Sequence, residues 1–375
     1  MIRRSNLLAW PLLCCGVLLA GCTLGPDKPK PQPLEAFTPQ IAGRMVWNRK
    51  LDGVNFPLVV RADNGVFTLA GDDGTVLAYD AATGAEMWRA SVGAKLAAGV
   101  GGDGRFASVV TRGGELVTLE AGQVKWRKPV GSRVSTPPLV AGERVFVLGV
   151  DRSVHAFDAL DGRRLWSQQR PGDPLTLAQA GVLFAFRNTL VVAHGPRLVG
   201  LDPAQGNVRW EVTLATPRGA NEVERLADLV GPAMRVGDTV CARAFQATVG
   251  CVDAARGSLI WSKNIGGTDG VAADEEYVFG ADASDRLTAW RIGNGEVAWT
   301  SDRFLYRGLS APRSAGNALL FGDAQGAVQW LSRDKGAPLL RLDTDGSPVV
   351  GAPAVSTGTT LVVTKAGGVF AFRPE

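Results

Sequence analysis

The residues able to perform specific chemistry are few in this chain. It has only two histidines, His155 and His194, which is too few for a multi-histidine metal site and unfavourable for a histidine-based catalytic centre. Both lie in strand-like stretches and are interpreted as packed or surface residues. The acidic pairs at 72–73 and 275–276 fit charged hairpin turns, and nothing else in the sequence supports a hydrolase with paired carboxylates. We therefore expect no metal and no cofactor.

The net charge excludes a further class of function. The 40 basic and 36 acidic residues give a formal charge of +4, and no run of Lys or Arg occurs. A protein that binds nucleic acid electrostatically carries a clustered basic surface. The sequence therefore favours a different kind of partner.

The first of the informative cysteines is Cys22. Arg3 and Arg4 precede an apolar run at 7–19, and the sequence Leu-Ala-Gly-Cys follows it directly, ending at Cys22. This pattern predicts a secretory signal peptide at 1–21, and the four residues 19–22 resemble the bacterial lipobox. By that resemblance Cys22 becomes the first mature residue and carries the lipid. Thr23 is not the Asp that marks inner-membrane retention in enteric lipoproteins, so the outer membrane is favoured by analogy. The proline-rich stretch 22–40 is interpreted as an extended tether.

Two further cysteines remain in the mature chain. Cys241 and Cys251 lie in the stretches TVCARAF and TVGCVD, which read as adjacent strands joined by a short turn. A turn centred on Gln246 would place them opposite each other, and an exported protein can form disulfides. The sequence leaves two alternatives open, a cross-strand disulfide and two packed thiols.

A repeat organises the rest of the chain. Residues 73–88 read DGTVLAYDAATGAEMW, and related stretches recur six more times with their glycines 38 to 51 residues apart. A period near 40 without a helical pattern predicts four short strands per unit, which is a propeller blade. The repeat typically ends in a tryptophan, whose large apolar ring is suited to docking between neighbouring sheets. Seven tryptophans hold this position: Trp47, Trp88, Trp126, Trp166, Trp210, Trp261 and Trp299.

The two ends of the chain complete the count of blades. Residues 366–373 match only the first half of the repeat, and residues 40–47 match only the second half. Together they make one further unit, so the N-terminal strand should complete the C-terminal blade. We expect an all-β fold, with residues 41–375 forming a single eight-bladed β-propeller of four-stranded antiparallel blades. Closure of this kind removes exposed sheet edges.

The repeat pattern Asp-x-x-Thr-Gly-x-x-x-Trp resembles the tryptophan-docking repeat of the pyrroloquinoline quinone (PQQ) dehydrogenases. With the lipobox, the short chain and the shared blade, the whole mature sequence resembles the BamB family, the lipoprotein subunits of the outer-membrane β-barrel assembly machinery. That resemblance implies a non-enzymatic scaffold at the periplasmic face of the outer membrane. It implies binding to the POTRA domains of BamA, the barrel-forming subunit, with other complex subunits and nascent outer-membrane proteins as further partners.

Two alternatives to this interpretation stand beside it. One is another cell-envelope scaffold with a different partner. The other is a PQQ-dependent dehydrogenase, but the resembling enzymes have longer chains and a vicinal cysteine pair. Here the only vicinal pair, Cys14-Cys15, falls within the predicted signal peptide.

Two stretches lengthen the repeat, at 167–187 and 213–230, in consecutive units. The family resemblance implies that loops at these positions face the POTRA domains. The residues it assigns to the partner-binding surface are Leu175, Leu177, Arg225 and Asp228. The sequence departs from the family pattern at Ala178, where the family has Arg, and at Val230, where it has a second acidic residue. Loops also lengthen at little thermodynamic cost without binding anything, which is the alternative explanation.

Overall fold

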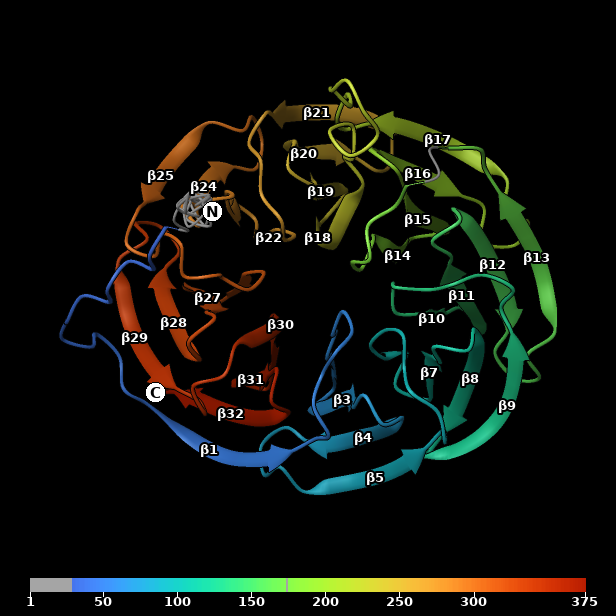
Figure 1. Ribbon diagram of the computed structural model, residues 1–375, viewed down its shortest axis with the longest axis horizontal. Coiled ribbons are helices and arrows are strands. Elements are labelled where there is room, and N and C mark those ends of the chain that lie inside the picture. The colour runs from blue at the N-terminus through green and yellow to red at the C-terminus, as the bar shows by residue number, and fades with distance from the viewer. Residues whose placement is uncertain (1–28, 173–174) are drawn as a thin grey trace, which may run out of the picture. The chain divides into compact units, whose positions relative to one another are not determined.

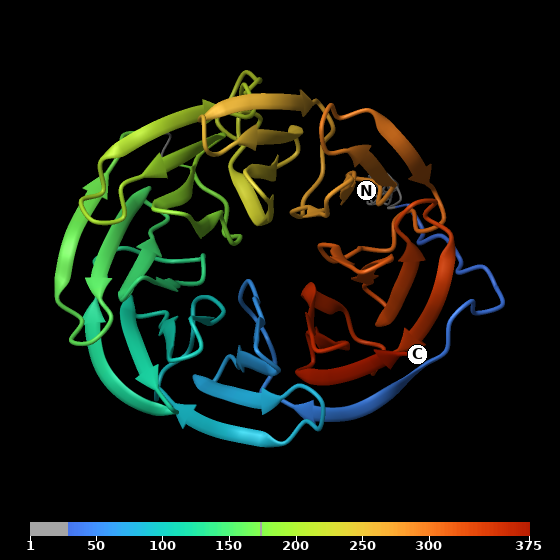
Figure 2. The same ribbon diagram turned by 180° about the vertical axis from the view of Figure 1, so that it is seen from behind.

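The computed structural model describes residues 29–172 and 175–375, and residues Pro31–Glu375 form one compact unit. All regular elements in the described part are strands, grouped in eight four-stranded antiparallel sheets. Figure 1 shows these sheets arranged as blades around a central axis, and Figure 2 shows the same ring from behind. The expected eight-bladed propeller is confirmed. Among the described residues, no helix is long and apolar enough to span a membrane.

Within each blade the strands run from the axis outward. The first four blades are numbered in chain order, and their strands are listed from the innermost to the outermost. Blade 1 consists of β2 (Arg61–Asp63), β3 (Val66–Ala70), β4 (Thr75–Asp80) and β5 (Glu86–Ser91). Blade 2 consists of β6 (Gly101–Gly102), β7 (Phe106–Val110), β8 (Glu115–Glu120) and β9 (Gln123–Pro129). Blade 3 consists of β10 (Leu139–Ala141), β11 (Arg144–Leu148), β12 (Ser153–Asp158) and β13 (Arg164–Gln169). Blade 4 consists of β14 (Leu183–Phe186), β15 (Thr189–His194), β16 (Arg197–Leu201) and β17 (Val208–Thr213).

The remaining blades follow the same plan, except that the last combines both ends of the chain. Blade 5 consists of β18 (Leu229–Val236), β19 (Thr239–Ala244), β20 (Thr248–Asp253) and β21 (Ser258–Lys263). Blade 6 consists of β22 (Ala272–Ala273), β23 (Tyr277–Ala281), β24 (Leu287–Arg291) and β25 (Val297–Ser301). Blade 7 consists of β26 (Arg313–Ala315), β27 (Ala318–Gly322), β28 (Ala327–Ser332) and β29 (Pro338–Asp343). Blade 8 consists of β30 (Val349–Ser356), β31 (Thr359–Thr364), β32 (Gly368–Pro374) and β1 (Gly43–Lys50).

The apolar core lies between adjacent blades. The second and third strands are buried on both faces, as in β7 and β8, while the outermost strand β9 is mostly exposed and buries Trp126. One apolar cluster joins Phe106 and Trp126 of blade 2 to Val145 and Phe157 of blade 3. Each blade is therefore stabilised by its neighbours through face-to-face sheet packing.

The repeated tryptophan docks on a glycine of the next blade. Gly162 lies in the β12–β13 turn with φ of +71°, and a Cβ there would stand 2.6 Å from the Trp126 ring. The Trp126 Nε1–H donates to the carbonyl of Ala159 in the same turn, at 2.8 Å. The glycine thus gives the turn its positive φ and leaves room for the ring. The same approach recurs at Gly84–Trp47, Gly122–Trp88, Gly206–Trp166, Gly257–Trp210, Gly295–Trp261 and Gly336–Trp299.

The N-terminal strand closes the ring as the two half-repeats predict. β1 pairs antiparallel with β32, with Arg44 opposite Arg373 and Lys50 opposite Gly368. In blade 7 the tryptophan is replaced by Leu340, which contacts Gly43 of β1. Eight docking contacts therefore run around the ring.

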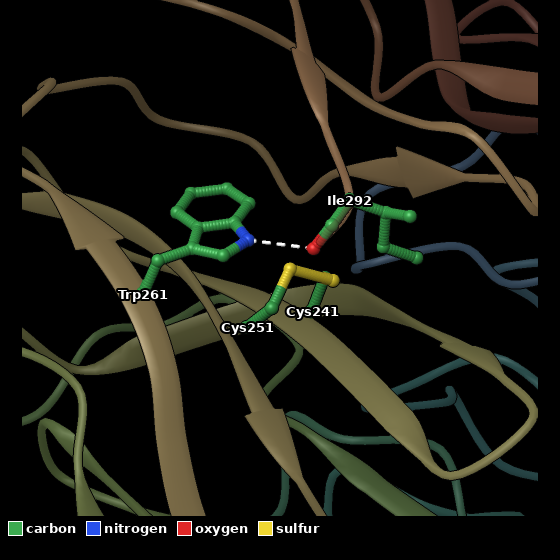
Figure 3. Close-up of a disulfide and its surroundings, with 4 residues drawn as sticks. All are labelled: Cys241, Cys251, Trp261 and Ile292. Carbon is green, nitrogen blue, oxygen red and sulfur yellow. Dashed lines mark hydrogen bonds between the residues drawn. A yellow bond between two sulfur atoms is a disulfide. The ribbon is translucent and has the colours of Figure 1, made fainter. Parts of the chain in front are cut away.

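Cys241 and Cys251 are joined by a disulfide. They are direct partners in the β19–β20 ladder, which turns around Gln246, and their Cα atoms are 4.1 Å apart. Both are fully buried. Figure 3 shows the bridge beside Trp261, whose Nε1–H donates to the carbonyl of Ile292 in blade 6 at 2.7 Å. The bridge therefore lies beside one of the blade-to-blade docking contacts.

Candidate partner-binding surface

Two long connections lie on one face of the ring. Strands alternate in direction, so each connection from a fourth strand to the next blade emerges on the same face as the turn between a second and a third strand. The β13–β14 connection (170–182) and the β17–β18 connection (214–228) therefore share a face with the β11–β12 and β15–β16 turns. We call the two long connections, with residues 173–174 excepted, the loop surface.

Asp228 ties the two connections together. Its Oδ2 accepts a hydrogen bond from the Leu177 N–H at 3.0 Å, and its Oδ1 lies 3.7 Å from Nη2 of Arg152. Its backbone carbonyl accepts from the Phe245 N–H at 2.9 Å. Only 17% of the Asp228 side chain is exposed. The carboxylate therefore positions the loops, and it presents little area of its own to a partner.

Arg152 is the second residue that holds these segments. It lies in the β11–β12 turn with φ of +66°, and its side chain is 12% exposed. A Cβ at Gly172 would stand 2.5 Å from its Nη1, and a Cβ at Gly195 would stand 2.8 Å from the same atom. Both neighbouring segments therefore approach the guanidinium as closely as they do because they carry glycine there.

The predicted leucines divide between the exterior and the interior. Leu175 is exposed at 36%, whereas Leu177 is partly buried. Leu177 lines a cavity of about 60 Å³ together with Leu148, Arg152 and Asp228. The structure thus brings Leu175, Leu177 and Asp228 to one surface, but only Leu175 of the three is well exposed.

Arg225 belongs to a turn at the tip of the second connection. The Asn221 Oδ1 accepts from the Glu224 N–H at 3.0 Å, and the Glu224 Oε2 accepts from the Ala220 N–H at 2.7 Å. Both hydrogen bonds involve Glu224, and together they order the turn. It presents exposed Arg225 beside Val223, which is 72% exposed. Sequence reasoning missed Val223; its position between Glu222 and Glu224 was the available signal.

Charged groups beneath the loop surface are paired. Glu211 accepts from Arg170 at 2.6 Å and from Arg197 at 2.5 Å, and the hydrogen bond from Arg170 is the main cause that lowers the pKa of Glu211. Burial, with the guanidinium groups of Arg170 and Arg152 as further causes, lowers the pKa of His194 to about 4. His194 is therefore neutral at physiological pH and packed, as interpreted from the sequence.

A larger cavity of about 670 Å³ lies on the ring axis. Its lining includes prolines of two kinds. Pro57, Pro138 and Pro312 precede inner strands, whereas Pro232 and Pro353 lie within β18 and β30 where the strand register shifts. At both kinds of position a backbone N–H is not needed for pairing.

The axial cavity is poor in groups that could do chemistry. Its charged lining residues are Arg61, Asp269 and Arg313, and burial raises the pKa of Asp269. Within the described ranges, no group of three or more His, Cys, Asp or Glu residues could hold a metal ion.

Comparison with known proteins gives concordant results. A family profile described as outer membrane protein assembly factor BamB matches residues 72–301. A protein of that name from Burkholderia pseudomallei is 34% identical over 374 residues, covering 98% of each chain. The one from Bordetella pertussis is 34% identical over 364 residues, covering 95% of this chain and 94% of its own.

Solved structures agree with the observed architecture. The crystal structure of BamB from Moraxella catarrhalis superimposes with a TM-score of 0.81 at 22% identity, covering 88% of this chain and all of that one. A quinohemoprotein alcohol dehydrogenase from Comamonas testosteroni gives 0.67 at 16% identity, covering 88% of this chain and 76% of its own. At these identities both show the shared fold alone. The two sequence relatives and the family profile decide the matter: this chain belongs to the BamB family.

Proposed function

We propose that this chain is a scaffold lipoprotein that takes part in outer-membrane protein assembly by binding the POTRA region of a BamA-like barrel-forming subunit. Its relatives are named as assembly factors for outer membrane proteins, and the chain is not an enzyme. The observation that carries the proposal is the loop surface, in which Asp228 joins two long connections into one structure.

The loop surface has the composition of a binding site. Leu175 and Val223 offer exposed apolar area, and Arg225 adds a charge at its edge. Protein interfaces commonly combine an apolar centre with a polar rim. Asp228 and Leu177 would contribute by holding this arrangement before the partner arrives, which lowers the ordering cost of binding.

The predicted location follows from the N-terminus. The signal peptide at 1–21 and the lipid-bearing Cys22 lie outside the described residues, and both are part of this proposal. Several acyl chains on Cys22 would hold the protein on the periplasmic face of the outer membrane. The propeller would then occupy the periplasm beside the barrel-forming subunit.

Affinity purification from detergent-solubilised envelopes tests the partner. We expect the wild-type chain to recover a POTRA-containing barrel protein, and Leu175→Asp combined with Val223→Asp to reduce that recovery about tenfold or more, because two apolar contacts are lost. Leu160→Asp is the matched control, since Leu160 is 52% exposed and lies in the β12–β13 turn on the opposite face. Failure of the wild-type chain to recover such a protein would refute the proposed partner. Equal losses in both variants would refute the assignment of the surface.

A further inference from the structure

The segment that precedes the ring lies against blade 7. We infer that residues 32–38, here called the strap, hold blade 7 close to the lipid anchor. Blade 7 is then the part of the ring nearest to the membrane, and the loop surface lies on the half of the ring farther from blade 7. This inference rests on the proposed lipid anchor at Cys22. Figure 1 shows the segment as the blue chain that passes outside β29 before it enters β1.

The first residue of the strap is held at both of its backbone polar groups. The Gln32 N–H donates to the carbonyl of Leu305 in the β25–β26 connection at 2.8 Å. The Gln32 carbonyl accepts from Arg307 Nη1 at 2.9 Å. Arg307 is itself buried and paired with the buried Asp323, with its Nε 2.7 Å from Asp323 Oδ2. The site that receives Gln32 is therefore built from a side chain whose position is already fixed by the core of blade 7.

Further contacts follow along the strap. Leu34 packs against the apolar cluster that contains Phe304 and Phe321. Glu35 pairs with Arg303, and its backbone carbonyl accepts from Arg341 Nη2 at 2.7 Å. The same Arg341 guanidinium lies 5.2 Å from the centre of the Phe37 ring. Backbone, apolar and charged groups all contribute, so the strap is attached along its length.

The course of the strap crosses the outside of blade 7. Leu305 belongs to a connection on the face of the loop surface, whereas β1 begins on the opposite face, next to the end at which β29 starts. Between them, the strap contacts Arg341 and the next residues reach Leu339, whose carbonyl accepts from the Gln40 N–H at 2.8 Å. The chain therefore leaves the ring on the same face as the loop surface, at blade 7.

The strap shortens the free chain between the lipid anchor and the ring. Ten residue steps separate Cys22 from Gln32, which span at most about 35 Å when fully extended. Without the strap, the free segment would run to Gly43 and span about 70 Å. In a ring of eight, blade 7 lies four places from blade 3, three from blade 4 and two from blade 5. The first long connection, between blades 3 and 4, therefore lies across the axis from blade 7, and the second lies about a quarter turn or more away (Figures 1 and 2). A short tether at blade 7 thus holds blade 7 nearer to the membrane than the loop surface, which leaves that surface within reach of a periplasmic partner domain.

Energy transfer to a membrane dye measures the predicted orientation. The lipidated full-length chain is placed in liposomes that carry an acceptor on their headgroups, and a donor is attached to Ala324→Cys in blade 7 or to Ala178→Cys in the loop surface. Both positions are exposed and lie on the same face, and Cys241 and Cys251 are bonded and buried, so labelling is specific. We expect stronger transfer from position 324 than from position 178. Equal transfer, or no transfer from either position, would overturn the inference.

A variant that releases the strap provides a second test of the orientation. Leu34→Asp with Phe37→Ala should release the strap and abolish the difference in transfer, whereas Ala36→Asp, an exposed position in the same segment, should preserve it. Persistence of the difference in the released variant would contradict the inference. Amide exchange of the wild-type chain tests the attachment without any substitution: the Gln32 amide should exchange about tenfold or more slowly than a free-chain amide. An unprotected amide would also overturn the strap.

These outcomes are separable from those of the proposed function. In detergent there is no membrane to orient against, so the strap variant should recover the barrel-forming partner as the wild type does. Reduced recovery by the strap variant in detergent would contradict the strap as an orienting device. Normal recovery by the wild type with equal transfer at the two positions would refute the strap and leave the partner assignment intact.

Discussion

At the scale of single residues, the candidate surface depends on two partly buried charges, those of Asp228 and Arg152. Asp228 was expected from the family resemblance to lie on the partner-binding surface, and the structure shows its carboxylate turned to Leu177 and Arg152. A largely buried carboxylate that has an ion pair and a hydrogen bond is costly to leave without these partners. Changes at Asp228 would therefore act on the shape of the loops before they act on any contact with a partner.

His194 gives a pH dependence that can be measured. Burial, followed by the charges of Arg170 and Arg152, lowers its folded-state pKa to about 4, below the usual value of 6.5. The unfolded chain therefore binds a proton between about pH 6.5 and 4 that the folded chain does not. We expect the free energy of unfolding to fall as the pH falls through this window, and His194→Gln to show a shallower fall. Denaturant titrations at several pH values measure both slopes. Identical slopes would show that His194 does not carry this effect.

The disulfide is a second residue-scale determinant of stability. A bridge that closes ten residue steps removes unfolded-state entropy equivalent to roughly 2–3 kcal/mol. We expect the double variant Cys241→Ala/Cys251→Ala to lose about this much free energy of unfolding in denaturant titrations. A reductant should destabilise the wild type but leave the double variant unchanged. A wild type whose stability does not respond to reductant under unfolding conditions would contradict this role.

At the scale of elements, the β-turn between the third and fourth strands is the point where blades meet. The turn needs a positive φ, and the docked tryptophan needs the space of a missing side chain. Gly162 meets both needs, because its φ is +71° and a Cβ there would collide with Trp126. The recurrence of glycine in the sequence therefore has two causes, of which the turn alone could be deduced from the repeat.

A pair of substitutions in blade 3 separates these two causes. Gly162→Ala introduces both the strained φ and the collision, whereas Gly142→Ala introduces only the strained φ, since nothing lies within 4 Å of a Cβ at that position. We expect Gly142→Ala to cost about 1 kcal/mol and Gly162→Ala to cost about 3 kcal/mol or more, because the ring must move. Thermal unfolding followed by tryptophan fluorescence measures the difference. Equal costs would mean that the Trp126 ring can move away from a Cβ at position 162 with little loss of stability.

At the scale of the whole molecule, the ring is closed by pairing the two ends of the described chain. β1 supplies the outermost strand of blade 8, and β32 lies between it and β31. The pairing removes the open edge that a truncated ring would present. It also places the strap and the closing strand in one continuous segment, so attachment of the strap and closure of the ring occur side by side.

Truncation tests the closure. A chain that ends at residue 367 lacks β32, so β1 loses its partner and blade 8 retains only β30 and β31. We expect this chain to lose cooperative unfolding and to expose apolar surface, as measured by calorimetry and dye binding. Glu375→Gln is the control: it removes only the exposed ion pair with Arg44, which is worth at most about 1 kcal/mol. A truncated chain that melts like the wild type would contradict the role of β32.

The sequence by itself determined the ring. Seven whole repeats and two half-repeats predicted eight blades and a shared last blade. Each whole repeat carries its strand alternation, its turn glycine and, except where Leu340 replaces it, its tryptophan within about 16 consecutive residues. Local patterns of this kind are visible without any knowledge of distant contacts. They also placed Cys241 and Cys251 opposite each other, although the choice between a bridge and two thiols needed the structure.

Only the tertiary structure decided how the candidate surface and the strap are built. Asp228 meets Leu177 across 51 residues of sequence, and Gln32 meets Arg307 across 275. Neither pair belongs to the repeat, so no periodicity connects its members. The physical reason is that the position of a loop depends on the blades it joins. The side chains that hold the loop are those that lie near it in space, and their spacing along the chain follows no pattern.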